Sequence, residues 1–303
     1  MELRIATCAY PVSADPARNE RWVLRQMGEA RERGAQIAHF PECALSGYVG
    51  PDLDSLDGYD WDALHASTER VLEHAARLGI WAVLGSTHPL TPPHRPHNCA
   101  YVVNARGDLE GRYDKRFCAG PDESGGELAH YTPGDHFTVF EVAGVRCGVL
   151  ICHDYRYPEL YRGYQRLGVQ VVFHSFYAGR ATRAQLRAAL RELGQPERAD
   201  ARSTIPGVTM PAAVTTAACT NHLWVSAANT SARESCFPAF AVRPDGIAAG
   251  RLRLNTSGVL ITDVDTQRGL YDSTAAWRRR AMDGVLHSGT PVEDPRSADL
   301  TAL

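Results

Sequence analysis

The sequence has almost no lysine: Lys115 is the one lysine among 32 basic side chains, and the others are all arginine. It has no basic block, its formal net charge is −3, and no apolar run approaches the ~20 residues of a membrane-spanning helix. The N-terminal MELRIATCAYPV is charged at positions 2 and 4, which predicts a first strand and not a signal peptide. These absences predict a cytoplasmic protein that binds neither nucleic acid nor membranes.

Motifs for metals, disulfides and serine hydrolases are missing as well. The eight cysteines contain no CxxC pair, the twelve histidines contain no HExxH or HxxxH run, and no GxSxG occurs. Scattered cysteines in apolar, strand-like contexts predict buried free thiols in a reducing compartment. We therefore expect no disulfide framework, no metal site and no serine nucleophile of the GxSxG type.

The surviving lysine itself carries information. A chain so rich in arginine could replace a surface lysine at little cost. The guanidinium group of arginine is planar and broad, so it cannot substitute for a compact ammonium where one point charge must fit a tight space. Lys115, in RYDKRF, is therefore a candidate for a residue required by chemistry, with survival by chance as the alternative.

Short β-branched runs alternate with helical patterns along the chain, which predicts an α/β sandwich. Asp15 and Pro16 predict the start of a helix that runs to about Arg33, and a second helix is expected over about 60–78, ending at Gly79. No linker or repeat divides the chain, so we expect one domain over 1–270. Strands are expected near 3–9, 37–40, 81–85, 99–104, 137–142, 145–152, 169–174, 223–228, 239–243 and 258–264, with a helix over 159–167.

One segment, about 180–215, has the character of an insertion. Residues 182–193 are amphipathic, which predicts a helix, and QPERADARSTIPG is polar with two prolines, which predicts a mobile loop. We expect this insertion to act as a lid that shapes the substrate site; a surface excursion or an oligomer contact is the alternative.

Three segments share one arrangement, in which a strand runs into a turn that carries a reactive group. They are IAHFPECALSGY with Glu42, GRYDKRF with Lys115, and VRCGVLICHDYRYPEL with Cys152. Open α/β sheets present ligands at such strand ends. A thiol between a strand and a helix that begins at Pro158 has the context of a nucleophile elbow.

These segments resemble the nitrilase superfamily of carbon–nitrogen hydrolases. FPECALSGY, YDKRF and ICHDYRYPEL match the family's Glu, Lys and Cys segments, and GELAHYTPGD matches a fourth segment that carries a second glutamate, Glu127. The four positions follow in order, separated by 73, 12 and 25 residues. The resemblance covers about residues 3–175 and 220–265.

The resemblance implies a four-layer αββα sandwich and a set of catalytic roles. Cys152 would attack an amide carbonyl, and Glu42 would act as general base and then acid. Lys115 and the backbone N–H of His153 would stabilise the oxyanion, while Glu127 would position Lys115 and the substrate. His174 and Tyr48 are further candidates for binding the oxyanion or substrate. The resemblance implies no cofactor.

Some neighbouring residues compete for these roles. Glu123 lies four residues from Glu127 in the same Gly-rich loop and is an alternative to it. His153 could form a dyad with Cys152, but neighbours in an extended segment point to opposite faces, so we expect its ring not to reach the sulfur. Asp154, Arg156 and Glu159 are expected to form a structural ion-pair and capping network.

The pair His153-Asp154 narrows the expected substrate. In the family, Trp-Glu after the nucleophile is typical of nitrile cleavage and an aromatic-Asp pair of amidases and carbamoylases, so an amide is favoured. N-carbamoyl amino acids stay possible because Arg180, Arg183 and Arg187 could grip a carboxylate. An acyltransferase on the same scaffold and a non-catalytic binding protein are the remaining alternatives.

The resemblance also implies a homodimer or larger even homo-oligomer. Its surface would include residues 158–168, with an aromatic, partly apolar interface supplied by Tyr157, Leu160, Tyr161 and Tyr164, unless these pack within the subunit. The C-terminal extension, 271–303, would pack on a partner subunit.

Overall fold

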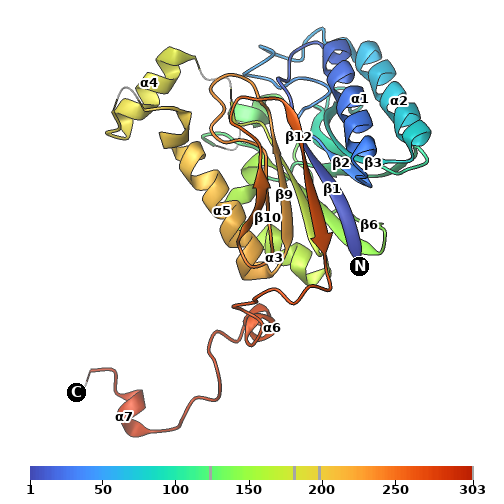
Figure 1. Cartoon of the computed structure of the whole chain (residues 1–303). Helices are drawn as coiled ribbons and strands as arrows, with labels where there is room; N and C mark the ends of the chain where they lie inside the picture. The colour runs from blue at the N-terminus through green and yellow to red at the C-terminus, as the bar shows by residue number, and fades with distance from the viewer. Residues whose placement is uncertain (123–124, 180–181, 197–198, 302–303) are drawn as a thin grey trace.

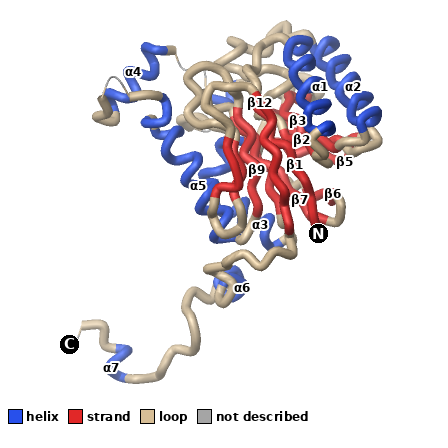
Figure 2. Tube along the Cα trace, in the orientation of Figure 1, coloured by secondary structure: helices blue, strands red, loops and turns tan. Residues whose placement is uncertain are grey.

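The computed structural model describes residues 1–122, 125–179, 182–196 and 199–301. Within them lie two six-stranded sheets, packed face to face between two pairs of helices (Figures 1 and 2). This is the four-layer αββα sandwich that the sequence predicted. The first sheet has the order β12 (Gly258–Asp265), β1 (Glu2–Ala9), β2 (Ile37–His39), β3 (Trp81–His88), β4 (His97–Val103), β5 (Leu109–Asp114). The second has the order β11 (Ala248–Arg251), β10 (Phe240–Val242), β9 (Trp224–Asn229), β8 (Val171–Phe176), β7 (Val145–Ile151), β6 (Val139–Val142).

The outer helices begin and end at capping residues. In α1 (Pro16–Glu32) the Asp15 side chain accepts from the N–H groups of Ala17 and Arg18, and Pro16 occupies the first helical position. In α2 (Trp61–Leu78) the Asp60 side chain caps the start. The helix ends at Gly79, whose left-handed φ of 63° suits glycine. Both predicted helices are confirmed within one or two residues.

Apolar faces hold the four layers together. Val23, Met27 and Val71, from α1 and α2, are fully buried against the outer face of the first sheet. On the other side, α3 (Pro158–Arg166) and α5 (Ile205–Asn221) pack against the second sheet. Between the sheets the core is filled by branched and aromatic side chains, among them Leu3, Ile5, Val83, Val149 and Phe173. Burial of these faces is the main force that aligns the two sheets.

The parallel strands in each sheet end at one edge. β1, β2 and β3 run parallel, as do β7, β8 and β9. The N–H of Glu42, just past β2, donates to the carbonyl of Phe176, the last residue of β8, at 3.2 Å. The two edges therefore meet, and the turns that follow β2 and β7 lie together where ligands are expected in open sheets.

The segment 180–215 differs from the predicted helix and loop. Its helix is present as α4 (Arg183–Glu192), but the polar stretch that follows leads into α5, which was not predicted. Thr204 caps α5 by accepting from the N–H of Gly207, and Pro206 sits in its first turn. The start signals were present, but Pro211 and many Val and Thr residues are poor helix formers, so tertiary packing on α3 and β9 stabilises this helix.

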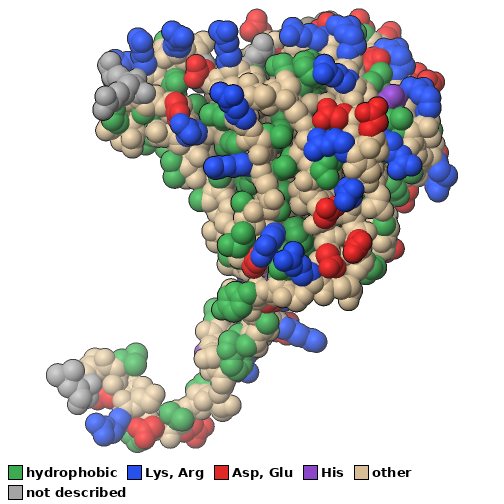
Figure 3. All heavy atoms as spheres, in the orientation of Figure 1, with side chains coloured by type: hydrophobic (Ala, Val, Ile, Leu, Met, Phe, Trp, Pro, Cys, Tyr) green, Lys and Arg blue, Asp and Glu red, His purple; other side chains and the backbone are tan. Residues whose placement is uncertain are grey.

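The C-terminal residues leave the body of the molecule as a tail with two short helices, α6 (Arg278–Met282) and α7 (Pro295–Ala298) (Figure 1). Tyr271, Leu286, Val292 and Leu300 are 72–92% exposed, and Figure 3 shows hydrophobic side chains on the surface of the tail. Among the described helices none has the length and apolar character needed to cross a membrane.

Candidate active site

The first turn, after β2, carries Glu42 into the interior, where its side chain has no exposed surface. The turn lies against β3 at Gly85: a Cβ there would be 2.0 Å from the carbonyl oxygen of Pro41 and 2.8 Å from the N–H nitrogen of Cys43. Both contacts are with backbone atoms, so only glycine permits this approach. Gly85 thereby allows the Glu42 turn to lie close against the first sheet.

Lys115 follows β5, and its side chain is 1% exposed. Its Nζ lies 2.7 Å from Glu42 Oε1 and 2.8 and 2.7 Å from the two oxygens of Glu127. Burial alone would lower the pKa of Lys115, but the two carboxylates outweigh it and hold that pKa well above its usual value. The lysine is therefore a permanently charged ammonium between two carboxylates.

Glu127 lies in a short 3-10 helix, Gly126–Ala129. One of its carboxylate oxygens accepts from the hydroxyl of Tyr48 at 2.6 Å, and the other accepts from the N–H of Ala119. Burial favours the neutral acid, but the charge of Lys115 and the hydrogen bonds from Ala119, Lys115 and Tyr48 lower the pKa of Glu127 below its usual value. Glu127 is thus a fixed anion, and Tyr48 lies in the cluster; its role in binding the oxyanion or substrate stays a prediction.

Asn98, in β4, is a member of the cluster that sequence reasoning missed. Its Nδ2 donates to Glu42 Oε1 at 2.8 Å and to Glu127 Oε1 at 3.3 Å. Its backbone carbonyl accepts from the backbone N–H of Lys115 at 2.9 Å. All the donors on Glu42 therefore converge on Oε1. The other oxygen, Oε2, is buried and has no hydrogen-bond partner in the described part of the chain. One carboxylate oxygen is left open as an acceptor.

Cys152 is the first residue of a 3-10 turn, Cys152–Arg156, directly after β7. Its φ of +42° is left-handed, a strained conformation for a residue with a side chain, and such strain is concentrated at functional sites. Burial, and then the nearby charge of Glu42, raise the pKa of the Cys152 thiol well above its usual value; Lys115 and the backbone N–H of Tyr177 oppose this only in part. The nucleophile candidate is therefore a thiol that burial and the carboxyl group of Glu42 favour in its neutral form.

Asp154 joins the Lys115 and Cys152 turns. Its carboxylate accepts from the N–H of Phe117 at 2.9 Å, the N–H of Ile151 at 3.0 Å and the hydroxyl of Tyr113 at 2.8 Å. The predicted structural role of Asp154 is therefore consistent with its contacts, but the predicted partners were wrong. Arg156 instead lies 5.0 Å from the centroid of the Tyr155 ring, and Glu159 is not among the hydrogen-bond partners of Asp154 in the described residues.

The two histidine candidates occupy different positions. His153 is half-buried and packs edge-on against Tyr155 and Tyr157. It lies in a tight turn and not in the extended segment that we expected, yet no contact joins its ring to Cys152 among the described residues. His174 is fully buried below the turn, with both ring nitrogens bonded to protein atoms, so direct contact with substrate was the wrong expectation.

Three arginines and one glutamate complete the list of predicted candidates. Glu123 and Arg180 lie outside the described residues. Arg183 and Arg187 are exposed on α4, which packs through Leu186 and Leu190 against Ala201.

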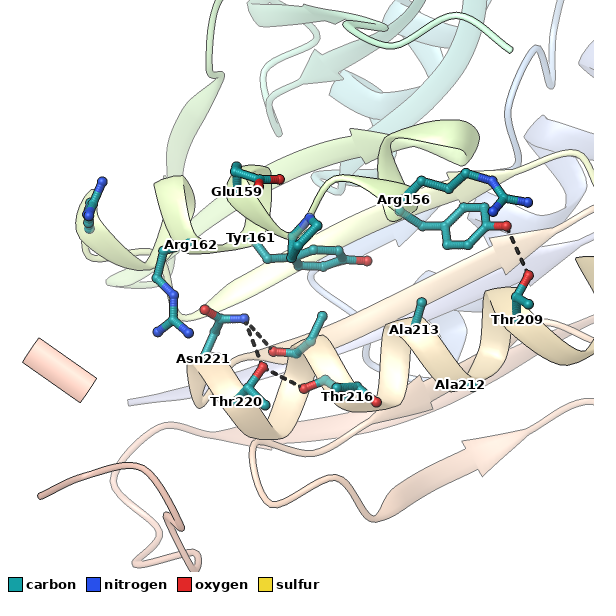
Figure 4. A pocket seen from close by; sticks show the side chains of 14 residues that line it. Arg156, Glu159, Tyr161, Arg162, Thr209, Ala212, Ala213, Thr216, Thr220 and Asn221 are labelled. Atoms are coloured by element: carbon teal, nitrogen blue, oxygen red, sulfur yellow. Dashed lines mark hydrogen bonds between the residues drawn. The ribbon is translucent and has the colours of Figure 1, made fainter. Parts of the chain in front are cut away.

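A groove of about 740 Å³ lies apart from this cluster, between α3 and α5 (Figure 4). Its walls include Arg162 on α3 and Thr209 and Asn221 on α5. Leu160, Tyr161 and Tyr164 were expected to form an aromatic surface here, but they are 4%, 1% and 0% exposed and pack within the subunit. The apolar face of the helix turns inward because it must cover the second sheet.

The cluster offers no evident metal site. No group of three or more His, Cys, Asp or Glu side chains within the described ranges is arranged to hold a metal ion. Fold and cluster together define an αββα protein with a Glu–Lys–Glu–Cys constellation at the meeting edges of its two sheets.

Comparison with known proteins agrees with this class. The family model described as carbon-nitrogen hydrolase matches residues 4–271, so the chain belongs to the carbon–nitrogen hydrolase family, within the nitrilase superfamily. A curated relative, omega-amidase NIT2 of Xenopus tropicalis, is 29% identical over 177 residues, 57% of this chain and 63% of the relative. The alignments with the first curated relatives span less than two thirds of the length of each.

Solved structures share the fold. The NitN amidase from Nesterenkonia sp. AN1 superimposes with a TM-score of 0.69 and 23% identity, over 92% of this chain and 99% of that one. A cysteine-to-alanine variant of the same amidase, in complex with butyramide, gives a TM-score of 0.67 and 22% identity over 86% and 90% of the two chains. At these identities the likeness concerns the architecture.

Proposed function

We propose that this protein hydrolyses the C–N bond of a small amide through a thioester on Cys152. The observation that carries the proposal is the polarisation of Glu42: Lys115 and Asn98 occupy Oε1, and Oε2 is left open. A buried carboxylate with one open oxygen, near a neutral thiol, is the arrangement that a general base requires.

In the first half-reaction the sulfur of Cys152 bonds to the amide carbon while its proton passes to Glu42 Oε2. The carbonyl oxygen becomes an oxyanion, stabilised by Lys115 and by the backbone N–H of His153. Because Nζ contacts both oxygens of Glu127, one N–H can turn to the oxyanion without loss of that pairing. The C–N bond then breaks, and Glu42 returns the proton to the departing nitrogen.

In the second half-reaction water attacks the thioester carbon and gives a proton to Glu42. The C–S bond breaks, the acid leaves, and the proton returns to the sulfur. Glu42 thus acts as base and acid in turn, for which a pKa above the usual carboxyl range is suited; burial raises the pKa of Glu42 in this direction. Glu127 keeps Lys115 in place throughout.

An amide is favoured over a nitrile because Asp, not Glu, follows His153 after the nucleophile. The names of the relatives, an omega-amidase and an amidase crystallised with butyramide, support the same substrate class. The experiment is ammonia release from primary amides, N-carbamoyl amino acids and nitriles, with Cys152→Ala as control. Amide turnover that disappears in the variant supports the proposal, and N-carbamoyl turnover would move the assignment to that subclass.

The same assay also tests whether the acyl group is transferred to an amine instead of to water. If ammonia release stops at one equivalent per protein and intact mass shows an acyl group on Cys152, addition of amines tests an acyltransferase. Absence of turnover, adduct and transfer would reject catalysis in favour of a binding protein.

We also propose a homo-oligomer in which a second copy covers the α3–α5 groove and receives the tail. Asn221 Oδ1 and Arg162 Nη1, both at the groove, are buried without a hydrogen-bond partner in the described part of the chain. The exposed apolar side chains of the tail, such as Leu286, also lack cover. Truncation after residue 270 should lower the number of subunits per particle measured by sedimentation; an unchanged subunit number would reject the role of the tail.

A further inference from the structure

His174 lies in the middle of a hydrogen-bonded chain below the candidate nucleophile. Its Nε2 is 3.2 Å from the carbonyl oxygen of Cys152, and its Nδ1 is 2.6 Å from the hydroxyl of Tyr161 on α3. The imidazole stacks on Phe176 with ring centroids 4.1 Å apart, and His174 has no exposed surface. The ring is therefore fixed on two edges and one face.

The chemistry of the two partners determines which nitrogen of His174 carries the proton. A carbonyl oxygen can only accept, so Nε2 must be the donor to Cys152. Nδ1 then has a lone pair and accepts the hydroxyl proton of Tyr161. Burial lowers the pKa of His174 to about 3, so the ring stays neutral and this tautomer holds near neutral pH.

The carbonyl of Cys152 and the N–H of His153 belong to one peptide group. A trans peptide is planar and its C=O and N–H point in opposite directions. A donor that holds the carbonyl toward the core therefore holds the N–H of His153 away from the core, toward the side where the substrate must lie. We propose that His174, with Tyr161 behind it, is the positioning pair that aims the His153 N–H at the developing oxyanion.

The local backbone explains why such a pair is required. The left-handed φ of +42° at Cys152 breaks the extended backbone of β7 directly before this peptide, and such a conformation is strained for a residue with a side chain. The turn is short, so rotation of this one peptide would move the N–H out of the site. His174 lies in β8, which pairs with β7, and its hydrogen bond therefore fixes the peptide relative to the second sheet.

This inference deepens the proposed amide hydrolysis, and its test separates the two. His174→Phe removes the donor and keeps a ring for Phe176, while His174→Gln can restore a donor near the position of Nε2. Tyr161→Phe removes only the hydroxyl that donates to Nδ1 of His174. The matched control is Tyr164→Phe on the same helix: its buried hydroxyl donates to the carbonyl of Val149 in β7, not to the turn.

Two readouts on the intact protein isolate the effect on the oxyanion. Alkylation of Cys152 by iodoacetamide forms a C–S bond and releases iodide, so it needs no oxyanion donor. Butyraldehyde adds the thiol across its C=O group and gives a tetrahedral oxygen in the oxyanion position, and protection from alkylation measures its affinity. This second measurement does not require amide turnover.

We expect His174→Phe to weaken butyraldehyde binding and to lower kcat, each by about 10- to 100-fold, as for a misdirected oxyanion donor. The change in KM should be smaller than the change in kcat. The rate of alkylation should stay within about twofold of the wild-type rate, because that step does not use the oxyanion donor. His174→Gln should restore most of the aldehyde affinity and of kcat. Tyr161→Phe should lower both by less than His174→Phe does, and Tyr164→Phe should leave both unchanged.

The inference is overturned if aldehyde affinity is unchanged in His174→Phe, if alkylation falls by the same factor as aldehyde binding, or if Gln restores nothing. A wild-type protein without amide turnover would instead refute the proposed function, while aldehyde protection would still decide the role of His174.

Discussion

The ammonium of Lys115 lies 2.7 Å from a carboxylate oxygen of Glu42, and neither side chain is more than 1% exposed. A buried ion pair of this kind contributes little net stability, because desolvation offsets most of the attraction. Its value is in what it orients: the pair directs one carboxylate oxygen to the lysine and leaves the other open.

Lys115→Arg should therefore abolish most activity although it keeps the charge. The guanidinium is planar and larger, and cannot place one compact N–H group between Glu42, Glu127 and an oxyanion. We expect kcat for the best amide to fall by about 10²–10³-fold, as for loss of an oxyanion donor.

The control for this change is the reverse substitution at an exposed site, Arg106→Lys, which should leave kcat and Tm unchanged. Lys115→Arg with near-normal turnover would show that only the charge matters at this position.

The acid limb of the plot of kcat/KM against pH should follow the ionisation of Glu42. Burial, and the neighbouring charge of Glu127, raise the pKa of Glu42, whereas Lys115 lowers it, and the net shift is upward. Glu42 accepts a proton only when ionised, so kcat/KM should fall with decreasing pH at a pH above the usual carboxyl range.

Glu127→Gln removes one of the charges that raise this pKa. The residual activity of the variant should therefore have its acid limb at lower pH than the wild type, in addition to a lower rate. A limb that moves upward, or does not move, would show that another group controls the profile. The measurement is kcat/KM against pH for both proteins with one amide.

Asn98→Asp tests whether Asn98 orients Glu42. A carboxylate there cannot donate to Glu42 Oε1 and adds a third negative charge beside Glu127, so the pKa of Glu42 should rise further and the acid limb should move to higher pH. Asn104→Asp, one residue past the end of the same strand, is the control and should leave the limb in place. An unchanged limb in Asn98→Asp would contradict the assignment.

Gly85→Ala should displace the Glu42 turn. The added methyl would meet the Pro41 carbonyl at 2.0 Å, and the turn must move. We expect kcat to fall by up to about 10²-fold, since a misplacement of 1 Å can cost that much. Gly28→Ala, where a Cβ meets nothing within 4 Å, is the matched control and should keep full activity. Equal activity in both variants would show that the turn adapts.

Leu190→Glu tests the lid hypothesis for α4. Leu190 is fully buried in the small cluster that attaches α4 to Ala201, so a charge there should detach the helix. If 180–215 acts as a lid, KM and substrate preference should change. Arg187→Glu, on the exposed side of α4, controls for charge. Kinetic constants that are unchanged in Leu190→Glu would assign the segment to a surface excursion.

The fold and the location of the cluster could be predicted because they are encoded locally. Asp15 with Pro16, and Gly79, mark helix ends through short-range hydrogen bonds and backbone freedom. Glu42 and Cys152 each follow an apolar strand directly, and parallel strand ends meet at one edge of the structure.

Other features depend on contacts between distant segments. Asn98 reaches Glu42 across 56 residues of sequence, and only after β4 has paired between β3 and β5. His174 was expected at the substrate because it ends a predicted strand; the strand in fact continues to Phe176 and turns the imidazole into the core. Helix α5 was missed because the polar stretch that contains Pro196 and Pro206 predicts a loop, whereas the helix begins within that stretch, capped by Thr204.

The burial of the solitary lysine makes Lys115 a specific probe of unfolding. A protease that cuts only after lysine has a single target in this sequence, and that target is inaccessible while the two sheets stay packed. Cleavage into two fragments at 115/116 would therefore measure exposure of the reaction centre itself, with no background from the surface. The same scarcity means that amine-directed labels attach to no exposed side chain of the folded chain.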